Sequence, residues 1–277
     1  ARAGCPSDTT DDPPDDPLPD DPPPALPVAN CGMDAYEMLQ FADVGEAVRW
    51  ERMDTFDLTA EGLNALLTLA GYEALTPVPY GVVLFRYRYT TQDRGEATEA
   101  TGMIAVPGHL DSAPEEPWPV ALLLHGYAGA WDACAPSADD LIGPAQPALL
   151  AAQGFVVVAP DYIGMNGMGA ASTSPHAPLV GEQMAIGSWD AMRAGMQLLR
   201  GDLADEFDGD LRDDMVIWGA SQGGHAAFFV EAAGPYYGPE FDVVGVVAAS
   251  PAHDQLSVVS DAMDQYSDST GLAALAL

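Results

Sequence analysis

Four short, uninterrupted apolar runs, separated by helical patterns, constrain the fold of this chain more than any other feature. The runs occupy residues 119–126, 154–160, 215–219 and 242–249. Runs this short, with no polar alternation, are typical of strands buried on both faces of a parallel sheet. The helical segments between them span 138–152, 181–200 and 222–233. Because strand and helix alternate, the sequence predicts an α/β fold with a mostly parallel sheet and helices on both faces.

The first half of the chain predicts a helix followed by a β-hairpin. Residues 59–71 place apolar side chains on one helical face, and Thr59 is a suitable N-cap. Residues 81–90 alternate and are rich in β-branched and aromatic side chains, as expected of a strand. Residues 100–106 supply a second strand after a polar turn at 92–95. We therefore expect an antiparallel hairpin at an edge of the sheet.

The charge of the chain excludes several classes of protein. Its 277 residues include 42 acidic and 9 basic residues, all of them arginine, for a net charge of −33. A polyanion of this kind is not expected to bind nucleic acid, or anionic lipid through a basic patch. The sequence holds no run of 18 apolar residues, so it predicts no transmembrane segment.

The N-terminal residues differ in composition from the rest. Residues 1–30 contain nine prolines and seven aspartates, which predicts a disordered acidic tether ahead of a domain over 31–277. Cys5 follows Ala3 and Gly4, as in a bacterial lipoprotein signal, although Arg2 departs from that pattern. Lipid attachment at Cys5 with a Cys31–Cys134 disulfide would require a secreted, cell-surface or periplasmic protein. Three free thiols in a cytosolic protein are the alternative.

The segment Gly219–Gly223 matches the pattern G-x-S-x-G around Ser221. An apolar strand over 215–219 leads into it and a helix over 222–230 leads out of it, which is the setting of a nucleophile elbow. Such a turn forces the serine backbone into a strained conformation that only very small neighbours allow. We therefore expect Ser221 to be a catalytic nucleophile.

A second loop completes this expected site. Residues 125–129 follow the strand over 119–124, where elbow enzymes place a backbone donor of the oxyanion hole. The donors expected here are the backbone N–H groups of Tyr127 and Gln222. His125 is interpreted as a structural loop residue, and we expect neither a metal ion nor a cofactor.

Several further segments carry a family resemblance. They are Tyr87–Thr91 with Gly95, Ala100–Gly102, His125–Gly126, Pro160–Gly164, Pro175–Pro178 around His176, Asp190–Ala194 and Gly219–Gly224. In order and spacing they resemble the secretory lipases of fungi and bacteria, the lipase A type of α/β-hydrolase. The resemblance covers roughly residues 80–255, and it implies hydrolysis of lipid or other ester substrates through an acyl-enzyme on Ser221.

The sequence offers no suitable candidate for the catalytic base. Two histidines follow Ser221: His225 is interpreted as a helix packing or capping residue, and His253 comes too early for a triad. Asp254 beside it is an alternative candidate for the acid, because some α/β-hydrolases carry the acid after this strand. The resemblance places a lid, the acid and the histidine beyond the strand over 242–249. We therefore expect 31–277 to be the N-terminal part of the domain, about 10⁴- to 10⁶-fold slower by itself than an enzyme with its base.

Other functions remain open at this point. An acyltransferase or a peptidase could use the same elbow, because fold does not determine substrate. A surface-tethered module with a vestigial Ser221 would be no enzyme at all. The acidic excess without lysine also suits a structural exoprotein of a salt-loving organism.

Overall fold

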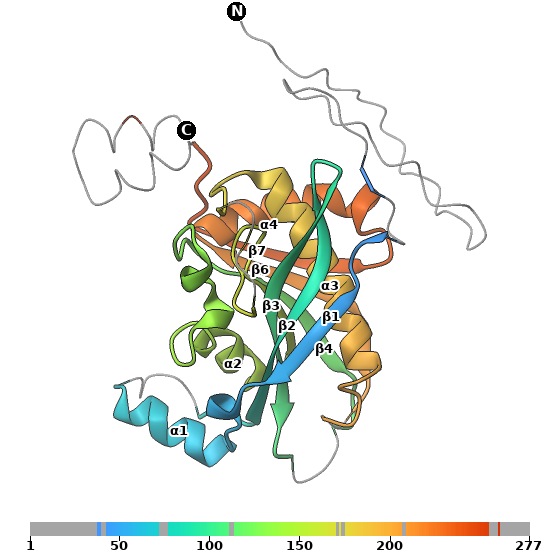
Figure 1. Cartoon of the computed structure of the whole chain (residues 1–277). Coiled ribbons are helices and arrows are strands. Elements are labelled where there is room, and N and C mark those ends of the chain that lie inside the picture. The colour runs from blue at the N-terminus through green and yellow to red at the C-terminus, as the bar shows by residue number, and fades with distance from the viewer. Residues whose placement is uncertain are drawn as a thin grey trace, which may run out of the picture.

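A seven-stranded mixed sheet runs through the part of the chain that the computed structural model describes (Figure 1). The described residues are 38–39, 43–71, 77–110, 114–169, 172, 175–206, 209–254 and 260. The strands are β1 (Ala47–Arg52), β2 (Gly81–Asp93), β3 (Glu96–Gly108), β4 (Trp118–Leu124), β5 (Val156–Pro160), β6 (Leu211–Ala220) and β7 (Asp242–Ala249). Their order across the sheet is β1-β2-β3-β5-β4-β6-β7.

The sheet is parallel at one end and antiparallel at the other. The strands β5, β4, β6 and β7 run parallel, so the carboxyl ends of β4 and β6 lie side by side. The strands β1, β2, β3 and β5 pair antiparallel. The expectation of an α/β fold is confirmed, but "mostly parallel" describes only the half of the sheet built from the four apolar runs.

The β-hairpin forms as expected, although it does not lie at the edge of the sheet. Asp93 faces Glu96 across a two-residue turn, in which Arg94 and Gly95 both have positive φ (51° and 79°), as such tight turns require. The strand β1 pairs on the outside of β2 and forms the true edge. Its six residues show no strict apolar alternation, so no local pattern indicated a strand there.

The helices lie where the sequence predicts them, but not all of them have the predicted length. They are α1 (Ala60–Leu69), α2 (Ala145–Ala151), α3 (Gly181–Arg200) and α4 (Gln222–Tyr237), with short 3₁₀ helices η2 (Asp54–Phe56), η3 (Asp132–Cys134) and η4 (Pro136–Ala138). Thr59 caps α1 by accepting from the N–H of Gly62. The helix α2 is shorter than expected, because Asp139 accepts from the N–H groups of Leu141 and Ile142 and closes a turn before it.

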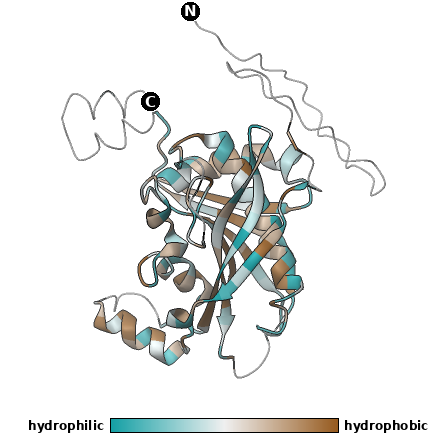
Figure 2. Ribbon diagram, in the orientation of Figure 1, coloured by the Kyte–Doolittle hydropathy of each residue, from teal (hydrophilic) through white to brown (hydrophobic). Residues whose placement is uncertain are grey.

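Helices cover both faces of the sheet, as expected. On one face α1 and α2 pack over residues such as Met103 and Val157, and on the other α3 and α4 pack over residues such as Leu122 and Ile217. Figure 1 shows α2 and α3 on opposite sides of the strands, and Figure 2 shows hydrophobic residues along the central strands.

The strand β7 is an exception to the expectation of burial on both faces. Val244 and Val247 of β7 are 59% and 47% exposed, and Trp218 of β6 is 38% exposed. The core covered by α1 and α2 includes a residue of β4 but none of β6 or β7, and β7 is the last strand of the described sheet. No helix of the described part is long and apolar enough to cross a membrane. The expected tether over 1–30, Cys5 and Cys31 lie outside the described residues.

Candidate active site

Ser221 occupies a sharp one-residue turn between a strand and a helix. The strand β6 ends at Ala220 and the helix α4 begins at Gln222. Ser221 has φ 56° and ψ −119°, a region that residues other than glycine rarely adopt and that costs about 1–3 kcal/mol. Its N–H donates to the carbonyl of Ala249 at the end of β7 (2.9 Å). The side chain is left exposed at the carboxyl end of the sheet.

The glycines around Ser221 are required by space. A Cβ added to Gly219 would lie 2.0 Å from the carbonyl oxygen of Gly223, and one added to Gly223 would lie 1.9 Å from that of Leu124. Both distances are far below any van der Waals contact. The pattern G-x-S-x-G therefore reflects the close approach of α4 to the ends of β6 and β4.

The loop after β4 lies directly beside this turn. A Cβ added to Gly126 would lie 3.6 Å from Cβ of Ser221 and 3.4 Å from the carbonyl oxygen of Ala220. Tyr127 follows in the chain and is 37% exposed. Gln222 is buried and is the first residue of α4, where backbone N–H groups have no partner within the helix. The segment of Tyr127 thus lies beside Ser221, which Gln222 follows directly in the chain.

A cluster of aromatic rings contacts the segments that carry Tyr127 and Gln222. The ring of Tyr162 lies 4.4 Å from that of His125 and 5.5 Å from that of His176, centroid to centroid. Tyr162 donates its hydroxyl hydrogen to the carbonyl of His125 (3.0 Å), and Nε2 of His176 lies 2.9 Å from the side-chain nitrogen of Gln222. Sequence spacing indicated none of these contacts; likeness to the family alone drew attention to His176.

Burial lowers the pKa values of the two histidines in this cluster. Burial lowers the pKa of His176 to about 4. The hydrogen bond to the carbonyl of Ile163 raises this pKa and so partly offsets the effect of burial. Burial also lowers the pKa of His125. Both rings are therefore neutral at neutral pH.

Asp161 holds the segment of Tyr162 in place. Its buried carboxylate accepts from the hydroxyl of Thr101 (2.6 Å) and from the N–H of Ser137 (2.9 Å). Burial raises its pKa, which the bonds from Ser137 and Thr101 partly offset. Asp161 therefore acts on the loop between β5 and α3 and makes no contact with Ser221.

The histidines of the chain all lie within the described residues, and each faces a group other than the Ser221 hydroxyl. The partners are Asp57 for His109, the carbonyls of Gly126 and Asp161 for His125, Ile163 and Gln222 for His176, the carbonyls of Ala252 and Leu179 for His225, and the carbonyl of Pro251 for His253. His225 is buried on α4, as a packing residue would be. No described group of three or more His, Cys, Asp or Glu side chains is placed to hold a metal ion.

The mixed sheet, with a strained serine between β6 and α4 at its carboxyl edge, has the architecture of the α/β-hydrolase fold. The sequence model of the secretory lipase family matches residues 146–277 of the chain. The resemblance inferred from the motifs is therefore confirmed. No protein of curated function matches the sequence significantly.

Solved structures share the fold at low sequence identity. A putative hydrolase from Legionella pneumophila is 20% identical with a TM-score of 0.65, over 83% of this chain and 58% of that one. The rice cell wall degrading esterase LipA from Xanthomonas oryzae is 24% identical with a TM-score of 0.63, over 79% of this chain and 53% of that one. The chain thus spans little more than half the length of either structure.

Proposed function

We propose that this chain carries the nucleophile and the oxyanion hole of a serine carboxylic-ester hydrolase. The observation that carries the proposal is the geometry of Ser221, a non-glycine residue held at φ 56° at the start of α4. Strain of this kind is retained where the surrounding structure requires it, and here it presents an exposed hydroxyl beside a helix N-terminus.

In the proposed reaction Ser221 Oγ attacks the ester carbonyl and loses its proton to a base. The carbonyl oxygen becomes an oxyanion, which accepts hydrogen bonds from the backbone N–H groups of Gln222 and Tyr127. Collapse of this intermediate expels the alcohol and leaves an acyl-Ser221 ester, which water cleaves in the second half-reaction.

We place the base and the acid of this triad outside residues 1–277. Support comes from the histidines, each of which faces a group other than the Ser221 hydroxyl. The chain also spans only 53–58% of the solved structures with this fold. The substrate that suits the site is an acyl ester, because the loop beside Ser221 exposes the rings of Tyr127 and Trp131 and family members are lipases.

Covalent labelling tests this function. A fluorophosphonate should label the complete protein at Ser221, and Ser221→Ala should abolish both labelling and hydrolysis of p-nitrophenyl esters, because no other group replaces the nucleophile. The matched control is Ser250→Ala, an exposed serine just after β7, which should change neither. Equal labelling of the unaltered protein and the Ser221→Ala variant, or no labelling of either, would contradict the proposal and favour a non-catalytic module.

A further inference from the structure

We infer that His176 and Tyr162 are positioning residues that hold the two oxyanion donors at a set separation. The inference rests on the proposed ester hydrolase, and it adds two residues that do not touch the reacting atoms. One ring supports the donor at the start of α4, and the other supports the loop that carries Tyr127.

The contact between His176 and Gln222 has a defined direction. Nδ1 of His176 lies 3.1 Å from the carbonyl of Ile163, which can only accept, so Nδ1 carries the proton. Nε2 therefore presents a lone pair and accepts from the side-chain nitrogen of Gln222 at 2.9 Å. The side-chain oxygen of Gln222 is buried and has no donor within the described residues. The hydrogen bond to His176 is thus what orients this side chain.

The orientation of the Gln222 side chain bears directly on its backbone. Gln222 is the first residue of α4, is 2% exposed and adjoins Ser221. Rotation of its side chain would move buried atoms in the first turn of the helix, where the N–H aimed at the oxyanion lies. His176 is itself 2% exposed, so its ring is held by packing.

Tyr162 links this half of the site to the other. Its ring stacks on His176 with an interplanar angle of 14°, and its hydroxyl donates to the carbonyl of His125, two residues before Tyr127. In return Nε2 of His125 faces the carbonyl of Asp161 at 3.2 Å. Tyr162 is in the left-handed region (φ 70°), which aims its ring between the two histidines.

The backbone at Gly164 packs directly against the backbone at His176. A Cβ added to Gly164 would lie 2.4 Å from the backbone nitrogen of His176, so the two segments are in direct contact. The N–H of His176 donates to the carbonyl of Ala130, in the loop that carries Tyr127 (3.0 Å). Tyr162 and His176 together therefore contact both donor segments. A shift of about 1 Å in such a group can cost on the order of 10² in rate.

A double-mutant cycle on the complete protein tests the inference. His176→Phe keeps a ring on Tyr162 but removes the acceptor, and Gln222→Met keeps the length of the side chain but removes the donor. Each should lower kcat for a p-nitrophenyl ester by about 10- to 100-fold and leave KM within about twofold, because only transition-state stabilisation is lost. The double variant should fall no further than the single variants, because both remove the same hydrogen bond.

A conservative variant separates positioning from folding. His176→Gln places an amide oxygen close to the position of Nε2, so it should retain most of kcat, and thermal unfolding should show that the variants are folded. If His176→Phe does not fold, Gln222→Met and His176→Gln decide alone. Additive losses, an unchanged kcat, or a loss confined to KM would overturn the inference. If the unaltered complete protein neither hydrolyses esters nor is labelled at Ser221, the proposed function fails, and this inference fails with it.

Discussion

Individual glycines and one strained serine determine the geometry of the elbow. Gly219 and Gly223 have no room for a Cβ, because backbone carbonyls occupy the space where it would lie. A few glycines of the chain lie instead in ordinary helical positions with room for a side chain. Gly62 in α1 is an example, since an added Cβ would meet only the hydroxyl of Thr59 at 3.4 Å.

Alanine substitution should therefore have opposite effects at two glycines. Gly223→Ala should lower the free energy of unfolding by about 3 kcal/mol, because the first turn of α4 must move away from Leu124. Gly62→Ala, the control, should raise it by about 0.5–1 kcal/mol, since alanine is the better helix former. Urea denaturation of both variants measures the difference, and equal effects would show that the elbow relaxes freely.

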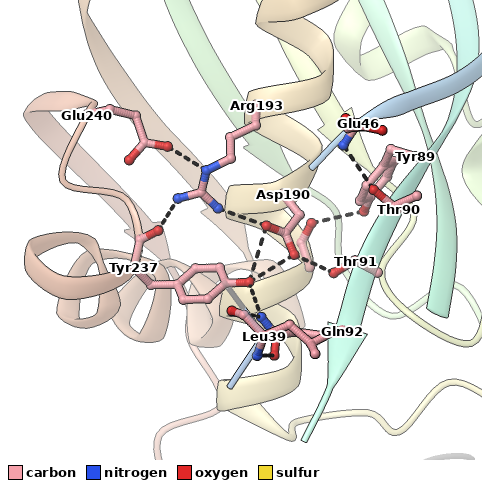
Figure 3. Close-up of polar contacts among 11 residues, drawn as sticks. Leu39, Glu46, Tyr89, Thr90, Thr91, Gln92, Asp190, Arg193, Tyr237 and Glu240 are labelled. Atoms are coloured by element: carbon pink, nitrogen blue, oxygen red, sulfur yellow. Dashed lines mark hydrogen bonds and ion pairs between the residues drawn. The ribbon is translucent and has the colours of Figure 1, made fainter. Parts of the chain in front are cut away.

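At the scale of elements, a buried ion pair joins α3 to α4 and β2 (Figure 3). Asp190 is fully buried, and it accepts from Arg193 (2.8 Å), from the hydroxyl of Thr91 (2.7 Å) and from the hydroxyl of Tyr237 (3.1 Å). Arg193 also donates to Glu240 and to the carbonyl of Tyr237. Burial raises the pKa of Asp190 to about 6, and Arg193 acts against this rise. The pair therefore anchors the carboxyl end of α4, the helix that begins at the elbow.

Removal of the arginine should leave this carboxylate uncompensated. Arg193→Met should destabilise the protein by about 3–5 kcal/mol at pH 8, because a buried charge loses its partner. The cost should be smaller at pH 5. A carboxyl whose pKa is raised on folding contributes its stability at low pH and loses it as pH rises through the folded-state value, so a protonated Asp190 has no need of Arg193.

The control for this variant is an arginine at the surface. Arg212 pairs with Asp214 at 2.6 Å with 52% of its side chain exposed, and Arg212→Met should change the free energy of unfolding little at either pH, because solvent screens the pair. Chemical denaturation at the two pH values provides the comparison. Similar losses for both variants would mean that the ion pair does not hold the two helices together.

At the scale of the whole molecule, the charge is far from balanced. Residues 1–30 contain seven aspartates and one arginine, a net of −6, which leaves −27 of the −33 on residues 31–277. Such an excess repels itself across a folded surface and opposes compactness. Salt screens this repulsion, because the Debye length falls from about 10 Å at 0.1 M to about 3 Å at 1 M.

We therefore expect sodium chloride to stabilise the protein. The midpoint of thermal unfolding should rise by about 5 °C between about 0.05 and 0.5 M salt, as the repulsion among acidic residues is screened. Replacing the seven aspartates of residues 1–30 by asparagine should leave this rise nearly unchanged, since most of the charge lies elsewhere. A midpoint that falls with salt would mean that ion pairs outweigh the repulsion.

The sequence by itself determined the features that depend on neighbouring residues. The four apolar runs, the N-cap at Thr59, the bounds of α3 and the turn at Ser221 are local patterns, and each predicts a backbone conformation without knowledge of the rest. The strained φ at Ser221 follows from the same pattern, because the glycines on either side permit it.

Only the tertiary structure decided which segments meet. Strand order, and which helices cover which strands, decide the position of β1 outside the hairpin and the exposed side chains of β7. They also decide which groups the histidine rings face in place of the Ser221 hydroxyl. The hydrogen bond between His176 and Gln222 joins residues 46 positions apart, and the one between Tyr162 and His125 joins residues 37 apart. No local pattern encodes such pairs, because their separation is set by the packing of the whole sheet and its helices.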